Sequence, residues 1–278
     1  MVKTTKDLKG RLESFRLSGE SVGLVPTMGC LHAGHLSLVS FAVSENQNVV
    51  VSIFVNPTQF NDQKDLERYP RNLDADVKLL EKTGCHIVFA PDINEVYPEP
   101  DYRKFNFGNL ETEMEGKYRP GHFNGVAQVV SKFFEMVKPN KAYFGLKDFQ
   151  QLAIIKNMVK QLESPVEIIA CPIVREESGL AMSSRNELLS AEERKNAALI
   201  FETLFKAKEL GYQKSVQELK KWIEDNINKN KFLTVEYADI VDDKKLQPIE
   251  SWNEKNTKVA CVAAYCGKVR LIDNIVLS

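Results

Sequence analysis

Short apolar segments alternate with longer amphipathic segments over the first two-thirds of this 278-residue chain, and this alternation restricts its fold more than any other feature. Five of the apolar segments have the length of buried strands and are rich in β-branched or aromatic residues. Strands that alternate with helices imply crossover connections, and therefore a parallel sheet. The predicted strands are residues 21–26, 49–55, 86–90, 142–144 and 166–170, and the predicted helices between them are 36–44, 73–82, 125–137 and 149–162.

The pattern changes after about residue 176, where two helical segments precede three strand-like ones. The last two strands are joined by Cys266-Gly267-Lys268, which has the composition of a tight hairpin turn. We therefore predict an α/β chain: a Rossmann-like parallel-sheet domain over residues 1–175, and a smaller α+β lid domain over residues 176–278 that begins at a polar hinge. The expected helices of the small domain are 191–210 and 216–228, and its expected strands are 234–241, 258–265 and 269–276.

Composition excludes several classes of protein. Lys and Arg total 37 against 38 Asp and Glu, so the net charge of −1 gives no global basic field for nucleic acid or an anionic membrane. No segment reaches the roughly 18 apolar residues that a membrane helix needs. The five cysteines are scattered and contain no C-x-x-C pair, so we expect no disulfide framework and a cytoplasmic location.

Unusual polar residues follow the predicted strands, where a parallel sheet places its ligand crevice. After the first strand comes P-T-M-G-C-L-H-A-G-H, which ends on His32 and His35 at the start of a helix. A helix start offers free N–H groups and a positive dipole end, and two imidazoles can add hydrogen bonds to phosphate oxygens. A zinc site or an ordinary helix cap is the alternative. Zinc requires three or four close ligands, and only Cys30 lies nearby.

The H-A-G-H string resembles the H-I-G-H signature of the nucleotidylyl transferase superfamily. Together with F-V-N-P-T-Q-F, Y-P-R, R-P-G-H-F, F-G-L-K-D-F-Q-Q-L, S-S-R-N and R-L-I-D-N, it resembles the pantothenate synthetase family. The resemblance implies a ligase that joins pantoate to β-alanine through a pantoyl-adenylate and releases AMP and pyrophosphate. It also implies ATP as co-substrate, Mg²⁺ and a homodimer.

The expected catalytic residues are His32, His35, Lys147 and Arg185, which can donate to phosphate oxygens or offset their charge; for Lys147, a solvated lysine at a helix start is the alternative. His35 is a proton donor in the family, although phosphate hydrogen bonding alone is the alternative, because adenylate chemistry needs no strong acid. The segment Met182-Ser183-Ser184-Arg185 resembles a shortened K-M-S-K-S loop. The expected ATP-binding residues are Met28, Gly29, Cys30, Leu31, His32, Ala33, Gly34, His35, Gly145, Leu146, Lys147, Asp148, Val174, Met182, Ser183, Ser184 and Arg185.

Two glutamines are the expected substrate contacts. A carboxamide donates to an oxyanion and accepts from a hydroxyl without forming an ion pair that would quench a nucleophilic carboxylate. The resemblance implies that Gln59 contacts pantoate and β-alanine and that Gln151 contacts pantoate. An apolar wall for the pantoate methyl groups is expected from Pro26, Met28, Phe54 and Val130.

Magnesium is expected to be held mainly by ATP phosphates and water. Asp76 aligns with a family acidic position near the metal and is the one candidate protein ligand, with a helix-surface Asp as the alternative.

Two other functions are compatible with part of the pattern. A nucleotidylyl transferase acting on another small carboxylate or on a phosphate substrate would share the H-A-G-H string, but a phosphate nucleophile favours more cations than two glutamines provide. A non-catalytic nucleotide sensor would also keep that string, yet it would not need Gln59, Gln151, Lys147 and Arg185 together.

Overall fold

A computed structural model describes residues 1–277, and it divides the chain into two compact units. The first unit comprises Met1–Phe107, Arg119–Leu146 and Gln151–Pro172. The second takes the rest of the chain from Ile173, together with the short segments Gly108–Tyr118 and Lys147–Gln150. The division therefore falls close to the expected residue 175, but two segments from the first two-thirds of the chain belong to the second unit.

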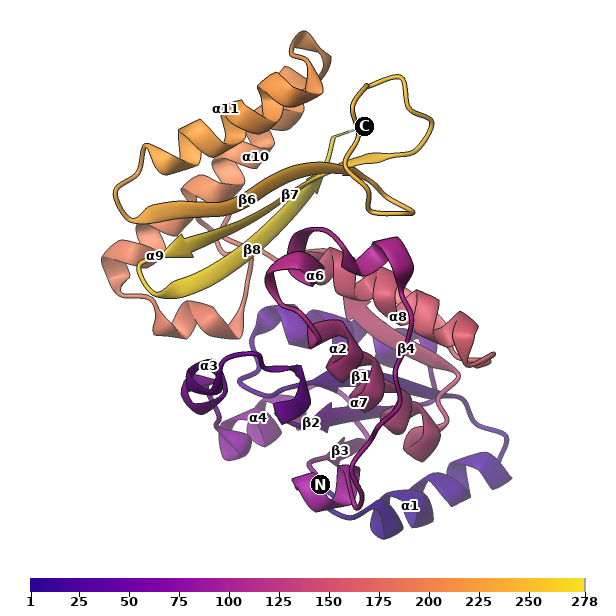
Figure 1. Ribbon diagram of the computed structural model, residues 1–278. Coiled ribbons are helices and arrows are strands. Elements are labelled where there is room, and N and C mark those ends of the chain that lie inside the picture. Colours follow the sequence, from indigo (N-terminus) through magenta and orange to yellow (C-terminus); the bar gives the residue numbers. More distant parts are fainter. Residues whose placement is uncertain (278) are drawn as a thin grey trace. The chain divides into compact units, whose positions relative to one another are not determined.

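The first unit contains the predicted five-stranded parallel sheet, in the order β3-β2-β1-β4-β5 (Figure 1). All five strands lie where the apolar segments predicted them, because a strand covered on both faces needs a continuous apolar sequence. They are β1 (Val22–Thr27), β2 (Asn48–Ile53), β3 (Ile87–Phe89), β4 (Lys141–Gly145) and β5 (Glu167–Cys171).

Helices cover both faces of this sheet. On one face, Leu38, Val39 and Ala42 of α2 pack with Leu80 of α4 against alternate strand residues. On the other face, Phe133 of α7 meets Phe54 and Phe89 edge-on. The helices of this unit are α1 (Thr5–Leu17), α2 (Ala33–Glu45), α3 (Gln63–Arg68), α4 (Leu73–Leu80), α5 (Ile93–Val96), α7 (His122–Val137) and α8 (Phe149–Gln161).

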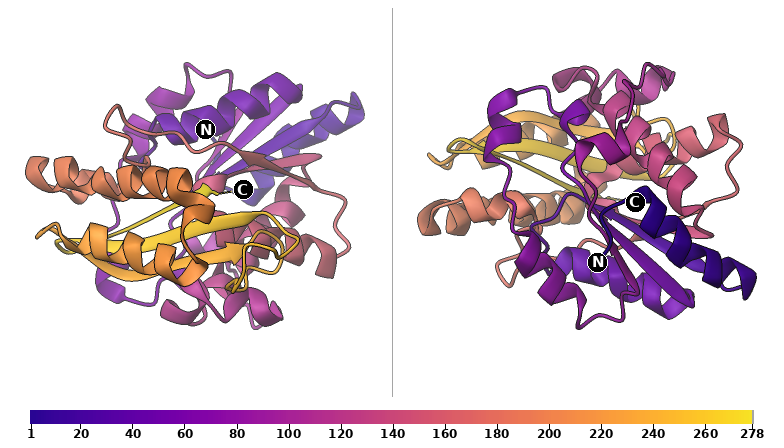
Figure 2. Two further views of the ribbon diagram at one scale, coloured as in Figure 1. Left: turned by 90° about the horizontal axis from the view of Figure 1, so that it is seen from above. Right: turned by 90° about the horizontal axis from the view of Figure 1, so that it is seen from below.

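The second unit is built on an antiparallel sheet in the order β6-β7-β8, as the sequence predicted. Figure 2 shows its orange helices lying along the yellow strands. The expected helix 191–210 is divided at Ala198 into two helices, and each of α9 and α11 starts at a serine capping box. The elements are α6 (Met114–Tyr118), α9 (Ala191–Ala197), α10 (Leu199–Leu210), α11 (Val216–Asn228), β6 (Leu233–Asp242), β7 (Lys258–Cys266) and β8 (Val269–Val276).

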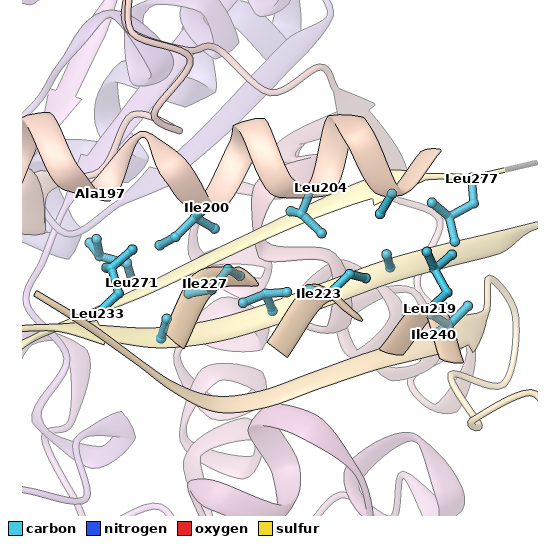
Figure 3. Packing of buried hydrophobic residues seen from close by; sticks show 14 of the residues in the cluster. Ala197, Ile200, Leu204, Leu219, Ile223, Ile227, Leu233, Ile240, Leu271 and Leu277 are labelled. Atoms are coloured by element: carbon cyan, nitrogen blue, oxygen red, sulfur yellow. The ribbon is translucent and has the colours of Figure 1, made fainter. Parts of the chain in front are cut away.

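The core of the second unit lies between its helices and one face of its sheet. Ile200 and Leu204 of α10 and Ile223 of α11 point toward strand residues such as Ile240 and Leu271 (Figure 3). All five side chains are at least 95% buried. This unit therefore has its own hydrophobic core, which is what an independently stable body requires.

The strand order of the first unit reverses between β1 and β4, and a ligand crevice is expected at the carboxyl ends of such a pair. The segments expected to bind ATP and pantoate follow β1, β2, β4 and β5. None of the helices in residues 1–277 combines the length and apolarity that crossing a bilayer demands.

Candidate active site

His32 and His35 are joined through a reciprocal cap at the start of α2. His32 is the N-cap residue, and its Nδ1 accepts from the backbone N–H of Gly34 at 3.1 Å. His35 Nδ1 accepts from the backbone N–H of His32 at 3.3 Å, and the two ring centroids lie 4.1 Å apart. A backbone N–H can only donate, so both Nδ1 atoms are acceptors, and each neutral ring carries its proton on Nε2. The fold therefore sets both histidines as Nε2–H donors.

Asp76 lies under the turn that precedes these histidines. Its two carboxylate oxygens accept from the backbone N–H groups of Cys30 at 2.9 Å and Leu31 at 2.7 Å. The turn has left-handed backbone at Gly29 (φ +80°) and at Cys30 (φ +51°). Burial raises the pKa of Asp76 above its ordinary value, and the two backbone hydrogen bonds oppose that rise.

The surroundings of Asp76 do not fit a magnesium site. Mg²⁺ requires octahedral coordination by oxygen ligands, most of them open to water. The side chain of Asp76 is 2% exposed, and both of its oxygens already accept hydrogen bonds. Within residues 1–277, no cluster of three or more His, Cys, Asp or Glu side chains is arranged to hold a metal ion.

Gln59 is held in one orientation by Asn56. The Nδ2 of Asn56 donates to the carbonyl oxygen of Gly125 at 3.0 Å and to Gln59 Oε1 at 3.2 Å, and its Oδ1 accepts from the Tyr97 hydroxyl at 3.0 Å. A carbonyl oxygen only accepts, so the Asn56 amide cannot be flipped. The carboxamide of Gln59 must turn Oε1 toward Asn56, and its Nε2–H groups then point toward Met28, whose sulfur lies 3.2 Å away.

The start of α7 clamps the backbone of the same turn. His122 is 4% exposed, and its Nδ1–H donates to the carbonyl oxygen of Gln59 at 2.8 Å. A Cβ atom at Gly125 would lie 2.5 Å from the carbonyl oxygen of Thr58, so only glycine allows this approach. In the sequence, His122 is marked only by its place in the R-P-G-H-F string.

A pocket of about 400 Å³ opens at the carboxyl ends of β1 and β2. Met28 and Phe54, two of the four residues expected to form an apolar wall, line it together with Gly29, Arg71 and Asp76. Gln151 lies half-buried in the first turn of α8, in the same unit as Gln59.

Lys147 and Asp148 follow β4 and belong to the second unit, whereas Gly145 and Leu146 close the preceding segment of the first. Lys147 Nζ lies 3.8 Å from Asp148 Oδ1, and its side chain is 18% exposed. The backbone carbonyl of Lys147 accepts from Asn274 Nδ2 at 2.9 Å. This bond links the G-L-K-D string to the R-L-I-D-N string, which are 127 residues apart.

Val174 and the Met182–Arg185 segment lie side by side in the second unit. The backbone N–H of Met182 donates to the carbonyl oxygen of Val174 at 3.0 Å. Ser183 caps a short 3-10 helix, Ser184–Leu188, and accepts from the backbone N–H of Arg185 at 3.3 Å. The structure therefore brings these predicted residues together locally. The intervening polar segment, predicted as a hinge, forms a tight turn closed by a bond from Gly179 N–H to the Glu176 carbonyl.

Arg175 and Asp273 form a buried ion pair that the sequence did not reveal. Two guanidinium nitrogens of Arg175 donate to the two Asp273 oxygens at 2.6 and 3.0 Å. The guanidinium also lies 3.9 Å from the centroid of the Phe201 ring. A guanidinium that pairs with both oxygens of a carboxylate restricts the orientation of both side chains. The pair therefore holds the adjacent residues in place, Val174 beside Arg175 and Asn274 beside Asp273.

Four of the cysteines have surroundings that keep the thiol protonated: Cys85, Cys171, Cys261 and Cys266. All five are free thiols, and Cys171, Cys261 and Cys266 are buried. Burial raises the pKa of Cys85 and of Cys171 to about 11, so both remain protonated thiols at neutral pH.

Comparisons with known proteins lead to the same family as the sequence strings that form the candidate site. The family model of Pantoate-beta-alanine ligase matches residues 1–276. The pantothenate synthetase of Bacteroides fragilis is 57% identical over 275 residues, which cover 99% of this chain and 98% of the relative. That of Porphyromonas gingivalis is 53% identical over 272 residues, covering 98% and 97%.

Two solved structures share the fold along the whole chain. The crystal structure of pantothenate synthetase from Thermus thermophilus has a TM-score of 0.92 at 43% identity, covering 99% of this chain and 98% of that one. That of the pantoate-beta-alanine ligase from Francisella tularensis, complexed with beta-gamma ATP and beta-alanine, has a TM-score of 0.83 at 35% identity, covering 99% and 97%. The chain thus belongs to the pantoate–β-alanine ligase family.

Proposed function

We propose that this chain condenses (R)-pantoate with β-alanine at the expense of ATP, through a pantoyl-adenylate. The observation that carries this proposal is the reciprocal cap of His32 and His35, which presents two Nε2–H donors at the end of β1. A donor pair at a helix start suits the oxygens of a triphosphate. Membership of the ligase family supports a small carboxylate as the nucleophile.

In the proposed first step, a pantoate carboxylate oxygen attacks the α-phosphorus of ATP, and the bond from that phosphorus to the pyrophosphate oxygen breaks. Negative charge accumulates on the phosphate oxygens, so catalysis consists mostly of positioning and fixed positive potential. His32 and His35 stabilise these oxygens by donation from Nε2. Their Nδ1 atoms are already acceptors of backbone N–H groups, which supports hydrogen bonding rather than proton transfer as the role of His35.

The remaining expected ATP contacts are assigned to the same step, except Cys30 and Leu31, whose backbone N–H groups donate to Asp76. Lys147 supplies a point charge and Arg185 a guanidinium, with Ser183 and Ser184 as hydroxyl partners. Met28, Gly29, Ala33 and Gly34 shape the loop, and Gly145, Leu146, Asp148, Val174 and Met182 line the nucleoside side. We infer that Mg²⁺ enters as the ATP complex, where it offsets phosphate charge, since Asp76 does not fit an open metal ligand.

In the proposed second step, the amine of β-alanine attacks the pantoyl carbonyl carbon, AMP leaves, and the amine loses a proton. Gln59 is suited to both substrates because its Nε2–H groups face away from Asn56 and donate to a carboxylate. Gln151 is the second pantoate contact. We also propose a cytoplasmic homodimer in which residues 176–278 act as the lid of the nucleotide site; the family resemblance and the free thiols support this assignment.

Isotope exchange tests the adenylate directly. Protein, MgATP, D-pantoate and labelled pyrophosphate, without β-alanine, should produce labelled ATP, because the first step is complete and reversible without the amine. Addition of β-alanine should yield one AMP per pantothenate. Exchange that requires β-alanine would contradict a separate adenylate, and exchange that proceeds without pantoate would mean that a group of the protein itself accepts the adenylyl group.

Asn56→Asp should raise KM for pantoate by about tenfold or more, since a hydrogen bond to a charged group is worth roughly 1.5–3 kcal/mol. Aspartate offers only acceptors, so Gln59 must rotate its Nε2 toward residue 56 and turn Oε1 toward the carboxylate. Tyr97→Phe removes a bond on the far side of Asn56 and should leave KM nearly unchanged. Steady-state kinetics on both variants, with circular dichroism to verify folding, distinguishes rotation of Gln59 from general damage.

A further inference from the structure

We propose that Asp76 is a positioning residue that builds the Gly29–Leu31 turn before any nucleotide binds. The effect on catalysis rests on the proposed function. The turn itself does not, because it is present in the protein without bound ligand. Its carboxylate occupies the place that an anionic ligand would take against two successive backbone N–H groups. The N–H groups of Cys30 and Leu31 are therefore engaged within the protein and are not phosphate ligands.

The turn is one that a chain does not adopt without support. Cys30 has a φ of +51°, a left-handed conformation that non-glycine residues rarely hold unless surrounding contacts enforce it. Such a backbone points consecutive N–H groups toward one side and forms an anion-binding concavity. Asp76 fills this concavity from α4, more than 40 residues along the chain, and charge-assisted bonds of 2.9 and 2.7 Å secure it.

Packing around the carboxylate leaves it little freedom. Asp76 is 2% exposed, and a Cβ atom at Gly29 would lie 2.9 Å from its Oδ2 and 3.1 Å from Ile53 Cγ2. Glycine at position 29 is thus required both by its φ of +80° and by the closeness of Asp76. Together, the carboxylate of Asp76 and the glycine at position 29 fix the path of the backbone that leads to the N-cap residue His32.

The consequence for catalysis follows from the chain order. Leu31 immediately precedes His32, whose backbone N–H bonds to His35 Nδ1. A shift of the turn therefore displaces the N–H group that orients His35, and with it both Nε2–H donors. Asp76 acts on the reaction through the histidines and not through a metal ion.

Amide hydrogen exchange in the ligand-free, magnesium-free protein tests this directly. Wild-type Cys30 and Leu31 amides should be protected, although they lie in a loop. Asp76→Asn keeps the shape but offers one acceptor where two are needed, so both amides should exchange about 10- to 100-fold faster. Asp74→Asn, at an exposed position in the first turn of the same helix, is the matched control and should leave both rates unchanged.

Kinetics separates positioning from metal binding. In pyrophosphate exchange, Asp76→Asn should lower kcat about tenfold or more, as expected when a donor is misplaced, with the half-saturating Mg²⁺ concentration unchanged at fixed ATP. An altered Mg²⁺ requirement with unchanged amide exchange would overturn the proposal in favour of a metal ligand.

The wild-type measurement stands by itself if the variant does not fold. Unprotected Cys30 and Leu31 amides in the free wild-type protein would refute a preformed turn. Because this exchange experiment contains no substrate, its failure is distinguishable from failure of the proposed ligase activity, which the wild-type pyrophosphate exchange assay reports separately.

Discussion

Replacing His35 by alanine is expected to lower kcat for pantoate-dependent pyrophosphate exchange by about 10²–10³-fold, the loss typical of one transition-state hydrogen-bond donor. The physical reason is the fixed Nε2–H of His35, whose Nδ1 is held by the His32 backbone. The free energy of unfolding should fall by only about 0.5–2 kcal/mol, because one helix-capping contact is lost. Exchange kinetics and urea unfolding measure the two quantities separately.

His35→Gln is the matched control for the capping contact. A glutamine at this helix position accepts from the N-cap backbone N–H through its side-chain oxygen, as in an ordinary capping box. This variant should unfold near the wild-type urea concentration while turning over far more slowly. If His35→Ala kept near-wild-type turnover, the phosphate-stabilising role of the imidazole would be wrong. If His35→Gln lost as much stability as His35→Ala, the stabilising role of the reciprocal cap would be wrong.

Replacing Arg270 by alanine is expected to lower the free energy of unfolding by about 3–5 kcal/mol, the usual cost of removing one partner of a buried ion pair. Arg270 donates to both oxygens of Glu115 at 2.7 and 2.9 Å and bonds Glu236 at 2.5 Å. The side chains of Arg270, Glu115 and Glu236 are 18%, 9% and 17% exposed, so alanine would leave two largely buried carboxylates without a cation.

Tyr237 reinforces this cluster from β6. Burial, followed by the charge of Glu115, raises the pKa of Tyr237 well above its ordinary value, so its hydroxyl stays protonated. It donates to Glu115 Oε1 at 3.0 Å, and its ring stacks on Tyr118. These contacts fasten the 108–118 segment to the sheet of the second unit.

Tryptophan fluorescence during urea unfolding measures the effect of Arg270→Ala, because both tryptophans of the chain, Trp222 and Trp252, lie in the second unit. Arg270→Lys keeps a charge without the planar fork and should lose less stability. The double variant Glu115→Gln, Arg270→Met should recover part of the loss, since it removes one of the two uncompensated carboxylate charges and leaves Glu236. A loss below about 1 kcal/mol for Arg270→Ala would mean that water reaches the carboxylates.

Local signals allowed much of the fold to be predicted. Apolar runs located all five parallel strands, and the glycine at position 267 marked the β7–β8 hairpin. The helix α1 was not predicted, because its apolar residues are sparse among charges, although Thr4 caps it. Helix 191–210 was predicted without its division at Ala198, which has helical backbone angles and leaves no mark in the sequence.

The candidate site was predicted as a set of residues but not as a set of contacts. His32 and His35 were recognised from their spacing, yet their Nε2–H tautomers follow only from which backbone N–H each Nδ1 accepts. Asp76 was assigned to metal from its alignment, whereas the structure directs its carboxylate into the turn at Cys30 and Leu31. The sequence specifies residue types, whereas the role of a polar group depends on which partner it hydrogen-bonds, and only the structure shows that partner.

The sequence by itself determined the strands of both sheets and the family, because each depends on local periodicity or on contiguous strings. Tertiary structure alone decided which distant groups meet: Asp76 with Leu31, His122 with Gln59, and Glu115 with Arg270, 155 residues apart. A buried polar group is costly unless it is hydrogen-bonded, and which partner it bonds depends on how the chain packs and not on its neighbours in sequence.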